Sequence, residues 1–311
     1  MPPISLASYL KLIGVALFWG GTWIAGRVAV SEASPLAVAS WRFLLAATVL
    51  GSLLVARQGW PRWTRQQWGM VVALGVSGIF LYNLCFLYGL KFIEAGRGAL
   101  VVALTPAVIG LADWLLFGAT MTLRKALGIA VAMAGCLLVV TNGHLAALLT
   151  GGIGIGEWLI MGCVVLWAAY TFIGRRATRS LSPLAATFGA ALTGWAMLTL
   201  AALADGSLFA LAATTWKAWA GIAFLGVFGT AIAFTWYADA VHQLGATRAG
   251  AFINLVPVFA VLLGALLLAE RLSPAALAGG ALVIAGVVIT NLVLRAPARP
   301  AAATVSGEPT P

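Results

Sequence analysis

The stretch LKLIGVALFWGGTWIAGRVA at residues 10–29 decides the fold, because a related stretch, WLIMGCVVLWAAYTFIGRRA, returns at residues 158–177. Each is apolar over the roughly 20 residues that an α-helix needs to cross a hydrocarbon core of about 30 Å. A shift of 148 positions aligns their less common residues in order: Trp19 with Trp167, Gly26 with Gly174, and Arg27 with Arg175. The two stretches are therefore predicted to be related membrane-spanning helices, one in each half of the chain.

The same register continues through the rest of both halves. At the shift of 148, matching residue types pair Ser34, Pro35, Trp68, Gly78 and Phe80 with Ser182, Pro183, Trp216, Gly226 and Phe228. After three further residues the shift becomes 151 and pairs Arg97, Pro106, Gly128 and Gly135 with Arg248, Pro257, Gly279 and Gly286. Chance aligns many Ala and Leu residues in apolar sequence, whereas ordered matches of Trp, Pro, Gly and Arg indicate a duplication.

The composition is that of an integral membrane protein. Of the 311 residues, 62% are hydrophobic and 8% are charged, with a mean hydropathy of +1.04, far above that of a soluble domain. The net charge of +10 does not indicate nucleic-acid binding, because the 18 Lys and Arg residues are spread singly between apolar runs and form no basic face. Cys85, Cys136 and Cys163 fall inside apolar runs and are expected to be small core residues without disulfides.

Ten apolar segments long enough to span a membrane are separated by charged or Gly/Pro-rich breaks. They cover residues 10–29, 35–56, 68–90, 97–117, 126–141, 156–173, 183–203, 216–240, 248–269 and 274–294. The predicted fold is an all-α integral membrane protein of ten transmembrane helices. Its domains are a first five-helix repeat at 1–142, a linker at 143–155, a second repeat at 156–295 and a disordered tail at 296–311.

The distribution of Lys and Arg orients the chain, because positive charges are retained on the cytoplasmic side of a bilayer. With both termini inside, the inner regions hold twelve of the 18 and the outer regions hold five, while Arg42 lies within the second segment. We therefore predict a multi-pass protein of the inner (plasma) membrane with cytoplasmic N- and C-termini. Five spans per repeat is an odd number, so the second repeat runs through the membrane in the opposite direction.

Inverted repeats of this kind are typical of secondary transporters, in which two similar halves alternate around a site near the middle of the membrane. Polar and aromatic residues at that depth are the candidates for a substrate cavity, since an unsatisfied polar group there is costly. The candidates are Trp19, Tyr82, Asn83, Phe86, Trp167, Tyr170, Phe228, Trp236 and Asn254. Helix packing is the competing explanation for each aromatic residue, because such side chains also fill bundle cores.

Two prolines and several glycines mark special helix positions. Pro106 and Pro257 lie in mid-span at equivalent places, where proline frees a backbone carbonyl and bends the helix. We predict that they are hinges, with a static bend as the alternative. Small residues in the fifth and tenth segments predict close helix packing without any role in substrate binding: Gly128, Gly135, Gly279 and Gly286.

Charged residues inside the segments are few. Arg42, in the outer third of the second segment, is a candidate for a charge role or for snorkelling to the outer surface. Asp113, in the inner third of the fourth, is a candidate hydrogen-bonding group or proton acceptor. Their depths differ, so no pairing between them is predicted. Arg97 and Arg248 begin equivalent helices, and they either anchor those helices at the interface or attract an anionic substrate group.

Motifs for several other chemistries are missing. The sequence contains no GxxxxGK[ST] loop and no cluster of metal ligands, so neither a cofactor nor a metal is expected. It also contains no GxSxG motif and no pair of acidic residues in mid-span, so an intramembrane hydrolase is disfavoured and no enzyme is expected.

Three stretches of the second half form a recognisable pattern: LVPVFA at 255–260, LAERL at 268–272 and GGALVIAG at 279–286. They resemble the C-terminal end of the EamA repeat in the drug/metabolite transporter superfamily. The first half is similar more weakly, through residues 19–27, WRF at 41–43 and TP at 105–106. It departs from the pattern where Gly118-Ala119-Thr120 stands opposite Ala269-Glu270-Arg271, so a role for the glutamate in both halves is not expected.

The resemblance implies a basket of ten helices around a central cavity, lined mainly by the first, third, fourth, sixth, eighth and ninth spans. Members of this superfamily mostly export amino acids and other small metabolites, and the mid-span aromatic residues point towards its aromatic amino-acid exporters. We expect a monomeric secondary transporter that exports amino acids, aromatic ones among them, or similar small metabolites by alternating access, with membrane lipid and a small-molecule substrate as its partners. The alternatives are an exporter of drugs or other metabolites and a membrane scaffold that transports nothing.

Overall fold

The computed structural model describes residues 6–144, 153–210, 214–244 and 252–291. Every regular element among these residues is a helix. The first half holds α1 (Leu6–Glu32), α2 (Pro35–Gln58), α3 (Arg65–Leu74), α4 (Tyr82–Phe92), α5 (Ala95–Val102), α6 (Thr105–Phe117) and α7 (Leu123–Val140). The second holds α8 (Ile155–Ala177), α9 (Pro183–Ala204), α10 (Trp216–Gly226), α11 (Ala233–Leu244), α13 (Val256–Leu268) and α14 (Pro274–Asn291). The predicted tail, most of the predicted linker and Arg248 lie outside the described residues.

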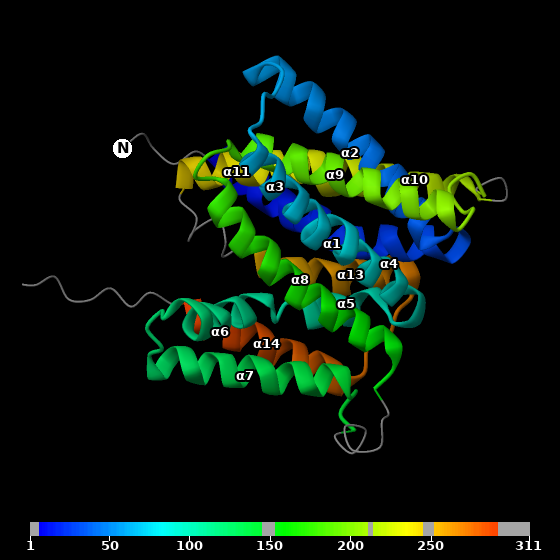
Figure 1. Cartoon of the computed structure of the whole chain (residues 1–311). Helices are drawn as coiled ribbons and strands as arrows, with labels where there is room; N and C mark the ends of the chain where they lie inside the picture. The colour runs from blue at the N-terminus through cyan, green and yellow to red at the C-terminus, as the bar shows by residue number, and fades with distance from the viewer. Residues whose placement is uncertain (1–5, 145–152, 211–213, 245–251, 292–311) are drawn as a thin grey trace, which may run out of the picture.

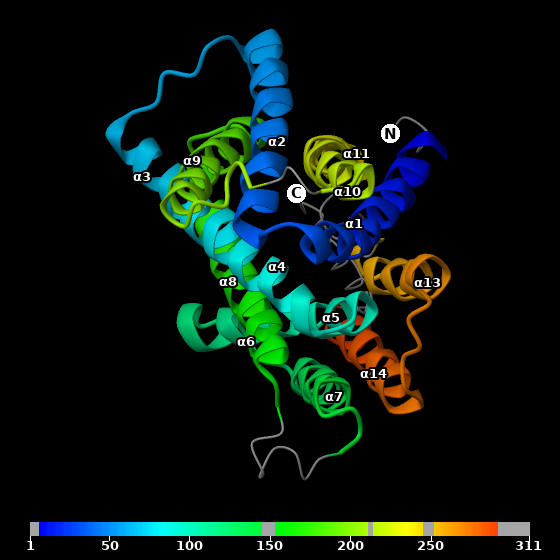
Figure 2. The same cartoon turned by 90° about the vertical axis from the view of Figure 1, so that its right-hand side faces the viewer.

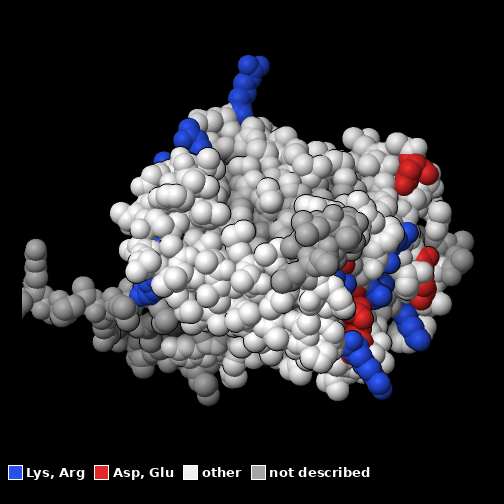
Figure 3. Space-filling model, turned by 90° about the horizontal axis from the view of Figure 1, so that it is seen from below, with Lys and Arg blue, Asp and Glu red and all other residues white. Residues whose placement is uncertain are grey.

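The described part of the chain has the shape of a membrane-spanning bundle. Eight helical spans are long and apolar enough to cross a membrane, and three of them, Arg65–Phe92, Ala95–Phe117 and Trp216–Tyr237, combine several of these elements. The two remaining predicted segments hold shorter apolar helices, Val256–Leu268 and Pro274–Thr290. Most helices run roughly along one direction in Figure 1. On the face seen in Figure 3, charged atoms gather towards the two ends and an uncharged band lies between them. An apolar band between charged ends is what a bilayer requires of a multi-pass protein.

Both mid-span prolines stand at the start of a helix. Pro106 occupies the first turn of α6, and Pro257 occupies the first turn of α13. In the fourth segment α5 ends at Val102 and α6 begins at Thr105, so a two-residue turn interrupts the helix just before Pro106. A proline in the first turn sacrifices no helical hydrogen bond, because that N–H has no partner within the helix anyway.

Two of the membrane helices contain a π-helical segment. The segment η1 (Gly75–Leu81) joins α3 to α4, and η3 (Val227–Ile232) joins α10 to α11. The sequence predicts continuous helices here, because an apolar run carries no signal for the wider turn. Just before η3, at the last residue of α10, the chain passes close to α2, since a Cβ atom on Gly226 would lie 2.6 Å from the carbonyl oxygen of Arg42. Such segments interrupt α-helices frequently at functional sites, so the residues around them are candidates for a functional site.

The last helix of each half packs tightly against the other. Figure 2 shows α7 and α14 side by side. A Cβ atom on Gly135 would lie 2.5 Å from the carbonyl oxygen of Gly279, and one on Gly279 would lie 2.7 Å from the carbonyl oxygen of Gly135. Gly128 and Gly286 approach each other in the same way. The prediction that these glycines allow close helix packing is confirmed.

Candidate functional site

A buried polar cluster, consisting of Arg42, Asn83 and Thr230, lies where α2, α4 and η3 meet. Arg42 is 7% exposed. Its Nη1 donates to Oδ1 of Asn83 at 3.0 Å, and its Nη2 donates to Oγ1 of Thr230 at 3.2 Å. The alternative that Arg42 snorkels to the outer surface is therefore wrong, because its guanidinium finds acceptors on two neighbouring helices inside the protein.

The two π-helical segments orient the acceptors of this polar cluster. Nδ2 of Asn83 donates to the carbonyl oxygen of Ile79 in η1 at 2.7 Å. The hydroxyl of Thr230 donates to the carbonyl oxygen of Leu225 at 2.9 Å. Because the donors of both side chains are engaged in this way, their oxygen atoms are left to accept hydrogen bonds from Arg42.

Four of the predicted cavity residues form one aromatic cluster, which adjoins the polar cluster through the neighbours Tyr82 and Asn83. The ring centroid of Trp167 lies 5.4 Å from that of Tyr82 and 5.2 Å from that of Tyr170. Tyr82 in turn stacks on Phe86 at 6.0 Å. The aromatic cluster thus joins α4 of the first half to α8 of the second. Trp23, whose ring lies 4.9 Å from that of Phe86, extends it and is absent from the predicted set.

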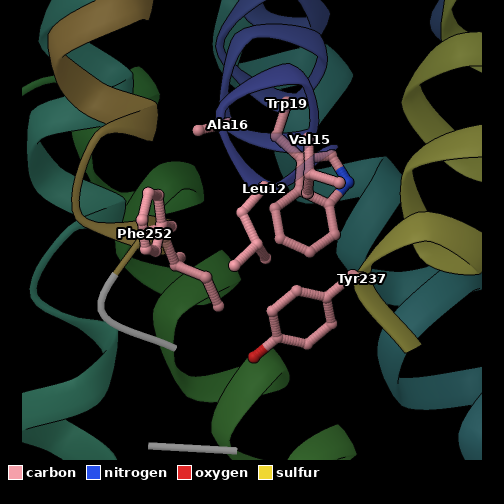
Figure 4. Close-up of a pocket in the computed structure, with 7 residues that line it drawn as sticks. Leu12, Val15, Ala16, Trp19, Tyr237 and Phe252 are labelled. Carbon is pink, nitrogen blue, oxygen red and sulfur yellow. The ribbon is translucent and has the colours of Figure 1, made fainter. Parts of the chain in front are cut away.

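Trp19 belongs to a separate aromatic group. Its indole Nε1 donates to the carbonyl oxygen of Gly229 at 3.1 Å, and its ring lies 5.6 Å from that of Phe234 and 5.4 Å from that of Tyr237. Figure 4 shows Trp19 and Tyr237 beside a narrow crevice between α1 and α11, which has no room for a water molecule. Trp19 and Trp167 are equivalent in sequence, yet they lie in different clusters.

Three other predicted residues lie outside the aromatic cluster. Phe228 is 41% exposed, and its ring lies 5.3 Å from that of Phe18. Trp236 packs against the same Phe18 at 5.6 Å. Asn254 lies in the turn before α13 and is partly exposed. Among the described residues, no ring contact joins Phe228 or Trp236 to Tyr82.

Arg97 contacts groups at the ends of two neighbouring helices. Its Nη1 lies 3.0 Å from Oε1 of Glu157 in α8, and its Nε donates to the carbonyl oxygen of Val139 at 3.1 Å. It therefore satisfies the C-terminal end of α7, where backbone carbonyls lack helical partners. The side chain ties three helices together.

Asp113 forms an ion pair with a residue that the sequence had not linked to it. Nη1 of Arg175 lies 2.9 Å from Oδ1 of Asp113, across α6 and α8. Arg27, the sequence equivalent of Arg175, has its Nε 3.7 Å from Oε1 of Glu270. Each of the two equivalent arginines thus pairs with a carboxylate of the other half. In the sequence, Glu270 stood out only as part of the family-like stretch LAERL, and that stretch gives no indication that its partner is Arg27.

A polar pocket lies near the Arg27–Glu270 pair. A pocket of about 320 Å³ is lined there by Arg27, Glu94, Arg97 and Arg271, with Asn142 and Ser273 among the other lining residues. Within the described residues, no group of three or more His, Cys, Asp or Glu side chains is placed to hold a metal ion. The groups that the structure brings together at the polar and aromatic clusters are arginine, amide, hydroxyl and aromatic side chains.

Comparison with known proteins assigns the chain to a family. The sequence profile of the EamA-like transporter family matches residues 6–141 and matches again at residues 154–292. The chain belongs to this family. As a member, it is a membrane transporter of the drug/metabolite type, which is a class of transport proteins rather than of enzymes.

Three relatives illustrate the range of this EamA-like family. The chain is 30% identical over 290 residues to the uncharacterized transporter YyaM of Bacillus subtilis, covering 93% of this chain and 95% of YyaM. It is 27% identical to a probable terminal-alkyne amino-acid exporter of Streptantibioticus cattleyicolor, covering 90% and 92%. It is 28% identical to the uncharacterized inner membrane transporter YedA of Escherichia coli, covering 94% of each. Each of the three is named as a transporter or an exporter, and each alignment covers almost the full length of both chains.

A solved crystal structure shares the fold of this EamA-like protein. The TM-score is 0.62, with 22% sequence identity, over 92% of this chain and 98% of the other. The similarity concerns the arrangement of the helices and carries no information on the substrate.

Proposed function

We propose that this EamA-like protein is a secondary transporter that exports amino acids, aromatic ones among them, across the inner membrane. The observation that carries the proposal is the aromatic cluster at Tyr82, Phe86, Trp167 and Tyr170 beside the buried polar cluster. Aromatic rings pack well against the apolar part of a substrate, and a few polar groups orient it. The name of one relative, a probable amino-acid exporter, supports the same substrate class.

The proposed mechanism is alternating access by two inverted five-helix repeats that together form ten spans. The double match of the family profile supports a duplicated unit, with repeats at 1–142 and 156–295 joined by the linker at 143–155 and followed by the tail at 296–311. The helix starts at Pro106 and Pro257 are proposed hinges, because a broken helix concentrates movement at its break.

The proposed orientation has both termini in the cytoplasm. It is supported by the excess of Lys and Arg in the regions that would then face inwards, twelve against five. A location in the inner membrane is supported by the name of YedA, which is described as an inner membrane transporter.

Counterflow in proteoliposomes tests the proposed function. Vesicles that contain the purified protein and are preloaded with unlabelled L-phenylalanine are expected to accumulate labelled L-phenylalanine, and a parallel panel of other amino acids ranks the substrates. The same vesicles with and without a pH gradient show whether protons are coupled to transport. Folded protein that moves no amino acid while a known amino-acid transporter does so in matched vesicles contradicts the proposal and favours a scaffold or another cargo.

The substitution Trp167→Ala is expected to reduce L-phenylalanine counterflow by roughly three- to tenfold, since an aromatic pair contributes about 0.5–1.5 kcal/mol beyond its buried area. The variant loses the contacts of the indole with Tyr82 and Tyr170. The matched control is Trp158→Ala on the same helix, where the side chain is exposed. Equal losses of folded protein and of transport in Trp167→Ala indicate packing instead of substrate contact.

A further inference from the structure

Arg42 is a buried cation whose hydrogen bonds are incomplete. Two of its nitrogen atoms donate to the neutral oxygens of Asn83 and Thr230. Its Nε is buried and has no hydrogen-bond partner. A guanidinium carries five N–H donors in a rigid fork, so the two contacts leave most of its binding capacity unused. A buried polar group without a partner is costly, so the unpaired Nε–H of Arg42 favours binding of a further acceptor.

No carboxylate of the described residues neutralises Arg42. Seven of the eight acidic residues in the sequence are described, and the eighth is Glu308. Four of the seven pair with other cations, namely Asp113, Glu157, Asp239 and Glu270. Two others accept hydrogen bonds elsewhere, Glu32 from Thr215 and Asp205 from Ser207. The last, Glu94, lines the pocket near Arg27. A charge buried in a membrane bundle normally has a partner of opposite sign, and within the described chain Arg42 has none.

The position of Arg42 is fixed as a binding group requires. Its two acceptors come from different halves of the chain, Asn83 from α4 and Thr230 from η3, and each is held in turn by a backbone carbonyl. The guanidinium also lies 4.7 Å from the ring centroid of Phe43. The guanidinium is thus held at both Nη atoms while its buried Nε–H is unpaired, so an N–H edge of the fork is still available to a bidentate acceptor.

We propose that Arg42 binds the carboxylate of the transported substrate. The inference rests on the proposed function and assigns the anionic end of the amino acid, while the aromatic cluster takes its side chain. The guanidinium edge matches the two oxygens of a carboxylate. Asn83, which accepts from Arg42, is the sequence neighbour of Tyr82, whose ring contacts that of Trp167 in the aromatic cluster. The carboxylate of the bound substrate supplies the negative charge that no described residue provides to Arg42.

The wild-type protein is expected to require the carboxylate. L-phenylalanine should compete with labelled L-phenylalanine in counterflow, whereas L-phenylalaninamide, which has the same ring and amine but no carboxylate, should compete at least about tenfold more weakly. Equal competition by the amide overturns the assignment of Arg42.

The substitution Arg42→Gln tests the residue itself. It should raise the KM for L-phenylalanine at least about tenfold and remove the preference over the amide. Arg42→Lys, which keeps the charge but loses the fork, should fall between Arg42→Gln and the wild type. Arg57→Gln, at an exposed position on the same helix, is the matched control and should retain the wild-type KM. Arg42→Gln with unchanged KM and unchanged preference overturns the proposal.

The substitution Asn83→Asp separates substrate binding from helix packing. It places a fixed carboxylate at the position of an atom 3.0 Å from Nη1 of Arg42, so it supplies an internal partner that competes with the substrate. We expect a KM raised at least about tenfold in protein that still folds. If Arg42 serves only to tie α2 to its neighbours, the added ion pair leaves the KM as it was. The variant also loses the donation to Ile79, so its melting temperature is measured alongside.

Binding without transport distinguishes the two proposals. Thermal stabilisation of the purified protein by phenylacetate, a carboxylate without an amine, should be present in the wild type and absent in Arg42→Gln, while phenethylamine should stabilise neither. A wild-type protein that moves no amino acid but shows this pattern loses the proposed function and keeps the anion site. A protein that moves L-phenylalanine, but whose response to phenylacetate is the same in the wild type and in Arg42→Gln, keeps the function and loses the anion site.

Discussion

Gly135→Leu is expected to leave almost no folded, monodisperse protein in detergent, because it forces α7 away from α14. A Cβ atom at this position would lie 2.5 Å from the carbonyl oxygen of Gly279 and 2.6 Å from the backbone nitrogen of Val283. Backbone atoms cannot move aside as the end of a flexible side chain can, so the two helices must separate along their length. Overpacking of this kind costs about 3 kcal/mol or more. The fluorescence of a fused reporter during size-exclusion chromatography measures the surviving folded fraction.

Gly69→Leu is the matched control for this prediction. Gly69 lies in the helix α3, and a Cβ atom there would meet nothing within 4 Å. Leucine has a higher helix propensity than glycine, so this variant should elute and melt like the wild type or slightly better. Gly135→Ala should give an intermediate loss, since it introduces the clashing Cβ without the rest of the side chain. A Gly135→Leu protein that elutes and melts normally would show that close contact of α7 and α14 is not needed.

Much of the helical layout could be predicted from the sequence, because its causes are local. Helices α2 and α9 begin at Pro35 and Pro183, as expected from their prolines, since the first turn of a helix tolerates a residue without an N–H. The glycines of α7 and α14 were also assigned correctly to packing. The two π-helical segments and the break before Pro106 could not be predicted, because they depend on how neighbouring helices satisfy or displace particular backbone groups.

The candidate site was predictable in its residue types but not in its connections. Mid-span aromatic residues were recognisable from depth alone, and four of them do meet in one cluster. The burial of Arg42 was not predictable, because its acceptors Asn83 and Thr230 are 41 and 188 positions away in the sequence. Phe228 illustrates the same point, since its depth suited a cavity, yet its ring packs against Phe18 and Phe224 and not against the four rings of the aromatic cluster. Depth in the membrane follows from counting residues, whereas the direction of a side chain depends on tertiary packing.

Glu270→Ala is expected to lower the thermal stability strongly, because one carboxylate joins the two halves of the chain. Oε1 accepts the backbone N–H of Ala95 at 2.8 Å, and Oε2 accepts that of Gly96 at 3.0 Å. These are the first two N–H groups of α5, which have no partners within the helix and attract negative charge. Nε of Arg27 lies 3.7 Å from the same carboxylate, whose side chain is 7% exposed. Removing it leaves two backbone donors without their acceptor and Arg27 without its counter-charge, although Nη1 of Arg27 still donates to the carbonyl oxygens of Leu90 and Ile93.

The expected loss for Glu270→Ala is about 2–4 kcal/mol, since hydrogen bonds to a buried charge are among the stronger ones. Glu270→Gln should lose less, because its amide oxygen replaces one of the two acceptors while the charge opposite Arg27 disappears. The matched control is Glu94→Ala, next to α5, whose side chain makes no capping hydrogen bond, and it should melt close to the wild type. Thermal unfolding followed by tryptophan fluorescence ranks the variants. A Glu270→Ala protein as stable as Glu94→Ala would mean that water replaces the carboxylate at no cost. The hydrogen bonds of Glu270 to the start of α5 would then contribute nothing to the stability of the protein.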